Sequence, residues 1–152
     1  MKGNTERTFV IVKPDCIEKR LVGKVISGIE SLNLRIVQMQ WKKITAEECD
    51  VLYSKTKESL PEIFAAVVKH MTANFSIILV VEGENAVKKV RTLRGPTDLL
   101  NAPKGTVRRD FVTDEERELF RQGKNVKNVM HAADDEAEAR VEMILFFGKE
   151  GG

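Results

Sequence analysis

Residues 8–15 read TFVIVKPD, and this stretch decides most about the fold of the 152-residue chain. Its first five residues are apolar or β-branched, a composition that predicts a strand buried in a sheet. Proline cannot donate a sheet hydrogen bond, so Pro14 ends the strand and begins a loop. Lys13 is therefore predicted at the end of a buried strand, where it is better placed to hold an anion than a lysine on a mobile helix face.

Three further segments are predicted to be strands. In residues 37–41, Val37, Met39 and Trp41 alternate with polar residues, and this period of two predicts a strand with one buried face. The apolar runs FSIILVV at 75–81 and MILFF at 143–147 predict two more buried strands.

Helices are predicted between these strands. Apolar residues recur at helical spacing over 21–32 and 84–94, and Asn33 and Gly95 suit the ends of these helices. Capping boxes predict three further helix starts, at Thr45–Glu48, Ser59–Glu62 and Thr113–Glu116.

Two irregular segments interrupt this pattern. Residues 96–111 have little periodicity, and loops of that length inside a compact domain are usually functional. His131 stands in the second, just before a helix predicted over 135–142, and residues 149–152 are predicted to be a mobile tail. The order of elements predicts a single α+β domain, residues 1–152, whose antiparallel sheet is covered on one face by helices.

Composition narrows the class of protein. A formal net charge of +2 is a weak argument for nucleic acid. The longest apolar run, 77–81, is far too short to span a bilayer, and the N-terminal residues lack the apolar stretch of a signal peptide. Cys16 and Cys49 suggest reduced thiols rather than a disulfide framework. A soluble, cytoplasmic protein without a membrane partner is expected.

The side chains that can do chemistry are few. The chain has two histidines, and His70 on a predicted helix is read as a packing or surface residue, whereas His131 in a loop is a candidate functional group. Metal-ligand spacing, Walker A and GxGxxG sequences are missing, so a phosphate site would be built from side chains. The candidate cations are Lys13, Arg91, Arg94, Arg108 and Arg109.

Several ordered segments are distributed over nearly the whole chain: ERTF at 6–9, VKPD at 12–15, LVGKVI at 21–26, FAAVVKHM at 64–71, VEGENAV at 81–87, RTLRGPT at 91–97, GTVRRDF at 105–111 and NVMHA at 128–132. Together they resemble the nucleoside diphosphate kinase family.

This resemblance implies a ferredoxin-like four-stranded antiparallel sheet and a two-step, ping-pong transfer of a γ-phosphate through phosphorylated His131. It implies Mg²⁺ carried mainly by the nucleotide phosphates, with no metal ligands from the protein. Glu142 would orient the histidine ring. The implied nucleotide contacts are Lys13, Arg91 and Arg108 for phosphate charge, Thr97 for a phosphate oxygen, Asn128 for the ribose, Tyr53 beside the lysine, and Ile63 for stacking on the base.

Four departures from the family pattern stand out. Ala133 replaces a serine two positions after the histidine, which predicts slower turnover, and Ile63 replaces the base-stacking phenylalanine. Residues 111–125 resemble an insertion that would form a lid or a contact between subunits. The chain also ends soon after its last apolar run, although a homo-oligomer, first of all a hexamer, is still expected.

Two other functions compete with the kinase. Ala133 favours a weakly active or inactive homologue that binds nucleotide, DNA or protein as a regulator. A ferredoxin-like RNA-binding domain would need aromatic residues on a sheet face and a basic groove, and the strands near Phe9 and Phe75 lack that pattern.

Overall fold

The predicted strand at 8–12 is the centre of a four-stranded antiparallel sheet in a computed structural model that describes residues 4–148. Phe9, Val10, Ile11 and Val12 are fully buried, as the apolar run requires. The strands follow the spatial order β2-β3-β1-β4. Their bounds are Thr5–Val12 for β1, Arg35–Lys42 for β2, Ser76–Glu84 for β3 and Met130–Ala132 for β4.

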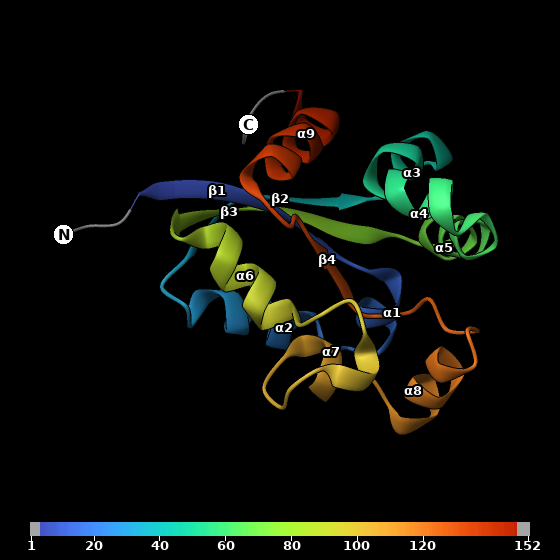
Figure 1. Ribbon diagram of the computed structural model, residues 1–152. Coiled ribbons are helices and arrows are strands. Elements are labelled where there is room, and N and C mark those ends of the chain that lie inside the picture. The colour runs from blue at the N-terminus through green and yellow to red at the C-terminus, as the bar shows by residue number, and fades with distance from the viewer. Residues whose placement is uncertain (1–3, 149–152) are drawn as a thin grey trace.

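Helices cover both faces of this sheet, not one face as predicted (Figure 1). Alternate residues of β1 explain why: Val10 and Val12 pack in one core with α2 and α6, while Phe9 and Ile11 pack in another with α3, α5 and α9. The fold is ferredoxin-like α+β, in agreement with the predicted class. The helices are α1 Pro14–Glu18, α2 Val22–Glu30, α3 Ala46–Leu52, α4 Ser54–Ser59, α5 Pro61–Ala73, α6 Ala86–Arg94, α7 Val107–Asp110, α8 Asp114–Arg121 and α9 Glu136–Phe147.

The prediction of a last strand at 143–147 is wrong. These residues continue α9, and the fourth strand is the three-residue β4 that contains His131. A short apolar run has no period that separates strand from helix. The helix is preferred because Met143 is buried with Ala139 one turn earlier, and because Phe146 stacks on Phe9 at 5.0 Å between ring centroids.

The side of β2 that is buried differs from the prediction. Met39 and Trp41 were predicted on the buried face, yet 53% and 55% of their surfaces are exposed. The pairing of β2 with β3 shifts between Ile36 and Gln38, and a bulge of this kind interrupts the alternation of sides. Trp41 instead stacks on Phe75, with ring centroids 5.3 Å apart.

The predicted helix ends are mostly confirmed. Thr45 and Thr113 form complete capping boxes, and Asn33 and Gly95 have positive φ angles of 60° and 95°. The box predicted at Ser59 is wrong, because its hydroxyl donates to the carbonyl oxygen of Lys55 within α4 and α5 starts at Pro61 without a side-chain cap.

The long irregular stretch at 96–111 contains a 3₁₀ turn, Leu99–Asn101, and the short helix α7. The tail predicted at 149–152 lies outside the described residues. Among residues 4–148, no helix has the length and apolar character needed to cross a membrane.

Candidate active site

The end of β1 brings Lys13 close to His131. β4 pairs with β1 so that His131 lies opposite Ile11, and the backbone N–H of Lys13 donates to the carbonyl oxygen of Val129 at 3.0 Å. Both side chains are buried, with 8% of His131 and 3% of Lys13 exposed. Two residues 118 positions apart in sequence therefore meet at one edge of the sheet.

His131 is held in an orientation that suits a nucleophile. Its Nε2 lies 2.8 Å from Oε1 of Glu142, which is 2% exposed on α9. With the carboxylate as acceptor, Nε2 carries the ring hydrogen and Nδ1 keeps its lone pair. Burial, assisted by the charge of Lys13, lowers the pKa of His131 to about 3. The ring is therefore neutral at pH 7, as attack on phosphorus requires.

Two buried arginines donate hydrogen bonds to β4 on either side of His131. Arg108 donates to the carbonyl oxygen of Met130 at 3.0 Å, and Arg94 donates to that of Ala132 at 2.7 Å. These arginines are only 5% and 7% exposed. They fix the strand that carries the histidine and bring two positive charges to its side.

The electrostatics of the site favour an anion. Burial, with the charge of Arg108 second, lowers the pKa of Lys13 to about 7. Burial, followed by the charge of Arg94, lowers the pKa of Arg108 to about 9. Cations that destabilise one another in a buried site are stabilised when a phosphate enters between them.

Two buried donors without hydrogen-bond partners also indicate that the site binds an anion. Within the described residues, the Tyr53 hydroxyl and Nε of Arg108 have no hydrogen-bond partner. Nζ of Lys13 lies 5.5 Å from the centroid of the Tyr53 ring and donates to Oδ1 of Asn128 at 2.6 Å. These groups form one polar corner beside His131.

The corner opens into a cavity of about 1070 Å³, large enough for a nucleotide. Its lining comes from α3, α4, α5, α9 and the α8–β4 segment. Apolar side chains line one part of it: Leu60, Ile63, Val67, Phe120, Val126 and Val141. The predicted site residues that line it are Lys13, Tyr53, Ile63, Thr97, Arg108, Asn128, His131 and Glu142.

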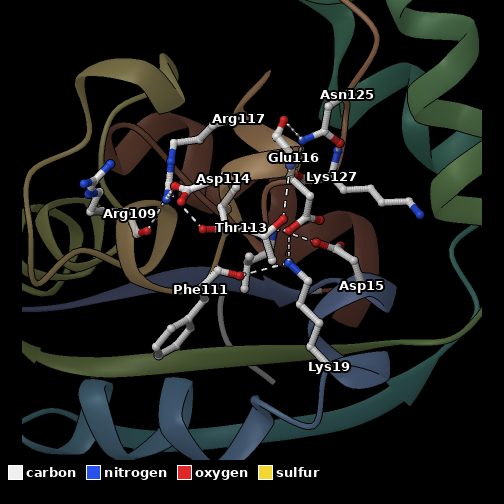
Figure 2. A network of polar contacts seen from close by, with 12 residues as sticks. Asp15, Lys19, Arg109, Phe111, Thr113, Asp114, Glu116, Arg117, Asn125 and Lys127 are labelled. Carbon is white, nitrogen blue, oxygen red and sulfur yellow. Dashed lines mark hydrogen bonds and ion pairs between the residues drawn. The ribbon is translucent and has the colours of Figure 1, made fainter. Parts of the chain in front are cut away.

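Residues 111–125, predicted as a lid or subunit contact, contribute to the lining of this cavity and make the polar contacts shown in Figure 2. Lys19 pairs with Glu116 and donates to the carbonyl oxygen of Phe111 at 2.9 Å. Arg117 donates to the backbone carbonyl oxygens of Arg109 in α7 and of Val112, at 2.9 and 2.8 Å. The residues of this segment that line the cavity are Phe120, Gly123 and Asn125. A moving lid or a contact between subunits stays a prediction.

Comparison with known proteins agrees with this geometry. The model of the nucleoside diphosphate kinase family matches residues 6–151. The chain belongs to the nucleoside diphosphate kinase family. It is 40% identical over 145 residues to the nucleoside diphosphate kinase of Archaeoglobus fulgidus, covering 95% of this chain and 88% of the relative.

Solved structures of nucleoside diphosphate kinases have the same fold. One from Borrelia burgdorferi, a transition-state mimic with bound vanadate and ADP, has a TM-score of 0.81 at 28% identity and covers 94% of this chain and 86% of its own. The enzyme of Aquifex aeolicus has a TM-score of 0.79 at 32% identity, covering 95% and 96%. The resemblance read from sequence segments is thereby confirmed.

Among the residues predicted to contact the nucleotide in this nucleoside diphosphate kinase, Arg91 does not line the cavity. Its exposed guanidinium donates to the carbonyl oxygen of Asp134 at 2.7 Å, while Arg94 lines the cavity. Arg94 was among the candidate cations read from the sequence, and its spacing from Val87 and Val90 puts it on the buried stripe of α6. The resemblance pointed to Arg91 alone, and its role at the phosphates stays a prediction.

The residues of the cavity suit a divalent cation that arrives on a nucleotide. Mg²⁺ prefers oxygen ligands, but the corner next to His131 holds Lys13, Arg94 and Arg108, which repel a free cation. In the part of the chain described, His131, Glu138 and Glu142 bring ligand atoms within 4.8 Å of one another. Oε1 of Glu142 is engaged by Nε2 of His131, and the absence of metal ligands from the protein stays a prediction.

Sequence reasoning missed the support beneath the site. Asp15, 2% exposed, accepts hydrogen bonds from Nε2 of His70 and from the backbone N–H of Val129, both at 3.0 Å. Val129 has a φ angle of 78°, a strained conformation for a β-branched residue, two positions before His131. Asp15 thus fixes the backbone that leads into β4. His70 was predicted as a packing or surface residue, and it takes part in this support through its hydrogen bond to Asp15.

Asp15→Asn is expected to lower the free energy of unfolding at pH 7 by about 1–3 kcal/mol, because an amide nitrogen cannot accept both hydrogen bonds. Burial alone would raise the pKa of Asp15, but the hydrogen bond from His70 and the charge of Lys13 bring it below 3.8. The ionised carboxylate therefore stabilises the fold at pH values above the pKa that it has in the unfolded chain. This stabilisation is lost as the pH falls through the lower pKa of the folded state. Urea unfolding between pH 3 and 7 should show a weaker acid dependence in the variant.

Asp50→Asn is the matched control, since its ion pair with Lys57 is about half exposed and contributes less than about 1 kcal/mol. Equal stability of Asp15→Asn and wild type at pH 7 would show that Asp15 does not support β4.

Proposed function

We propose that this protein transfers the γ-phosphate of a nucleoside triphosphate to a nucleoside diphosphate, and that Nδ1 of His131 carries the phosphate between them. The observation behind the proposal is the neutral, buried imidazole whose Nε2 is engaged by Glu142, beside three buried cations. In the first step a bond forms between Nδ1 and the γ-phosphorus while the bond to the β-phosphate oxygen breaks. The diphosphate leaves, and an acceptor diphosphate then reverses the same step.

Lys13, Arg108 and Arg94 supply fixed positive charge where charge shifts during transfer, which is the main form of catalysis open to phosphoryl transfer. The relative from Borrelia burgdorferi was solved as a transition-state mimic with vanadate and ADP, and this supports placing a phosphoryl group in the matching cavity. Mg²⁺ bound to the nucleotide phosphates would neutralise part of their charge.

The remaining contacts follow the family resemblance. Tyr53 and Thr97 would donate to phosphate oxygens, and Asn128 would donate to a ribose hydroxyl. Ile63, on the apolar part of the cavity, would stack on the base. A site without base-edge hydrogen bonds has little to reject one base in favour of another, so we expect broad nucleotide use. Arg91 would act from the rim, through its contact with Asp134.

A nucleotide-binding regulator is the second candidate, and Ala133 is the observation that favours it. Its methyl group is fully buried near the site and supplies no hydroxyl. Loss of such a polar contact costs roughly 0.5–1.5 kcal/mol when nothing is left unpaired, which slows turnover without removing the nucleophile. We therefore retain the kinase as the proposed function.

Labelling with γ-³²P-ATP and Mg²⁺ separates these two candidates. The kinase should take up phosphate that is labile in acid and stable in base, and should release it as labelled triphosphate when GDP is added. A folded, nucleotide-binding protein that takes up no label would support the regulator instead.

We further propose that residues 1–152 act as one domain in a cytoplasmic homo-oligomer, with a hexamer as the first expectation. Sedimentation equilibrium of the purified chain measures the number of subunits directly.

A further inference from the structure

A second carboxyl group lies behind the pair formed by His131 and Glu142. Glu138 is four residues before Glu142 on α9, so the two side chains lie on the same side of the helix. Ligand atoms of Glu138, Glu142 and His131 are all within 4.8 Å of one another. Glu142 already accepts from Nε2 of His131, so a proton that the two carboxyl groups share leaves Glu142 as a carboxylate acceptor only when Glu138 holds it.

The surroundings make a shared proton favourable. Burial raises the pKa of both Glu138 and Glu142 above the ordinary value of a glutamate. The pair faces the carboxylates of Asp134 and Asp135, the guanidinium of Arg94 and the neutral, titratable ring of His131. Two carboxylates this close, with more negative charge beside them, do not both ionise near neutral pH.

We propose that Glu138 is a positioning residue that retains a proton and donates it to Glu142, so that Glu142 stays an acceptor for Nε2 of His131. This inference rests on the proposed function, in which Nδ1 of the histidine is the nucleophile. Without the donor, Glu142 is free to turn or to take up the proton itself. A protonated Glu142 can donate to Nε2, and that contact favours the ring tautomer with hydrogen on Nδ1, which cannot attack phosphorus.

The Glu142 carboxyl group lies 2.8 Å from Nε2 of His131, and a ligand atom of Glu138 lies within 4.8 Å of it. When one of these two neighbours is removed, a single group is left to fix the orientation of the buried carboxylate. A hydrogen bond to a charged group contributes enough that its loss corresponds to about tenfold in rate or more.

Three variants test the proposal in single-turnover phosphorylation of the protein between pH 6 and 9. Glu138→Ala removes the donor and should slow phosphorylation about tenfold at pH 7. Glu138→Gln offers a donor that does not titrate, so it should recover most of the rate. The control is Glu136→Gln, an exposed glutamate on the same helix.

The pH profile separates positioning from a merely structural role. As the pH rises the pair loses its last proton in wild type, so the rate of Glu138→Gln relative to wild type should rise. Lys13 also titrates in this range, but it is present in both proteins and cancels in the ratio. A constant ratio from pH 6 to 9, or a Glu138→Ala rate equal to wild type, would overturn the proposal.

Nitrogen-15 NMR of the His131 ring gives a readout that does not need phosphotransfer. Wild type and Glu138→Gln should show hydrogen on Nε2, and Glu138→Ala should shift toward hydrogen on Nδ1. The same tautomer in all three proteins would also reject the role of Glu138. Failure of wild type to take up phosphate, with the tautomer shift present, would reject the proposed function and leave this inference intact.

Discussion

His131→Ala is expected to abolish phosphotransfer, with a loss of at least about 10⁴-fold in kcat, because the proposed reaction has no other group to form the covalent intermediate. The steady-state rate of GTP formation from ATP and GDP measures this loss. Labelling of the protein by γ-³²P-ATP should vanish in the same variant.

Binding of nucleotide should survive the substitution. Lys13, Arg108 and Arg94 stay in place, and alanine at 131 leaves the backbone pairing of β4 with β1 unchanged. Calorimetric titration with ADP should therefore give an affinity close to that of wild type. A variant that transfers phosphate as fast as wild type would remove His131 from the mechanism.

Lys13→Met is expected to lower kcat/KM by about 10²–10³-fold, since removal of one preorganised charge from a phosphoryl-transfer site has an effect of that size. The same substitution should leave the free energy of unfolding equal or higher. Burial lowers the pKa of Lys13 to about 7 from 10.5, so the charged side chain destabilises the nucleotide-free fold.

The pH dependence of unfolding checks this account of Lys13. Because its folded pKa is depressed, wild type should gain stability as pH rises from about 7 toward 10.5, and the methionine variant should lack this gain. Lys104→Met, at an exposed position, is the control and should change neither quantity by much. A Lys13→Met protein with wild-type activity would contradict a phosphate role for the lysine.

Much of the fold follows from local patterns. The apolar run at 8–12 followed by Pro14 predicted β1 and the position of Lys13, because a buried strand and a proline each impose a strong local constraint. Two capping boxes located the starts of α3 and α8 for the same reason.

The errors arise where tertiary contacts outweigh local preference. MILFF at 143–147 has the composition of a strand, but its packing on Phe9 makes it the end of α9. β4 has only three residues and owes its form to β1, so no period within it predicts a strand. The strand that carries His131 was therefore read as a loop.

The sequence predicted which residues form the site better than it predicted the contacts between them. The resemblance named eight residues that line the cavity, but it overlooked Arg94 and the support from Asp15. Both contacts join residues far apart in sequence: Arg94 with Ala132, and Asp15 with Val129. Such pairs are visible only once the sheet brings β4 against β1.

The most direct test of the mechanism is the position of the phosphate on the protein. Phosphorylated wild type, labelled with nitrogen-15 in histidine, is examined by ³¹P and ¹⁵N NMR, which identify the ring nitrogen that is bonded to phosphorus. Since Nε2 of His131 is engaged by Glu142, the account predicts phosphate on Nδ1 of His131. Phosphate on Nε2, on His70 or on a carboxyl or hydroxyl group would contradict it.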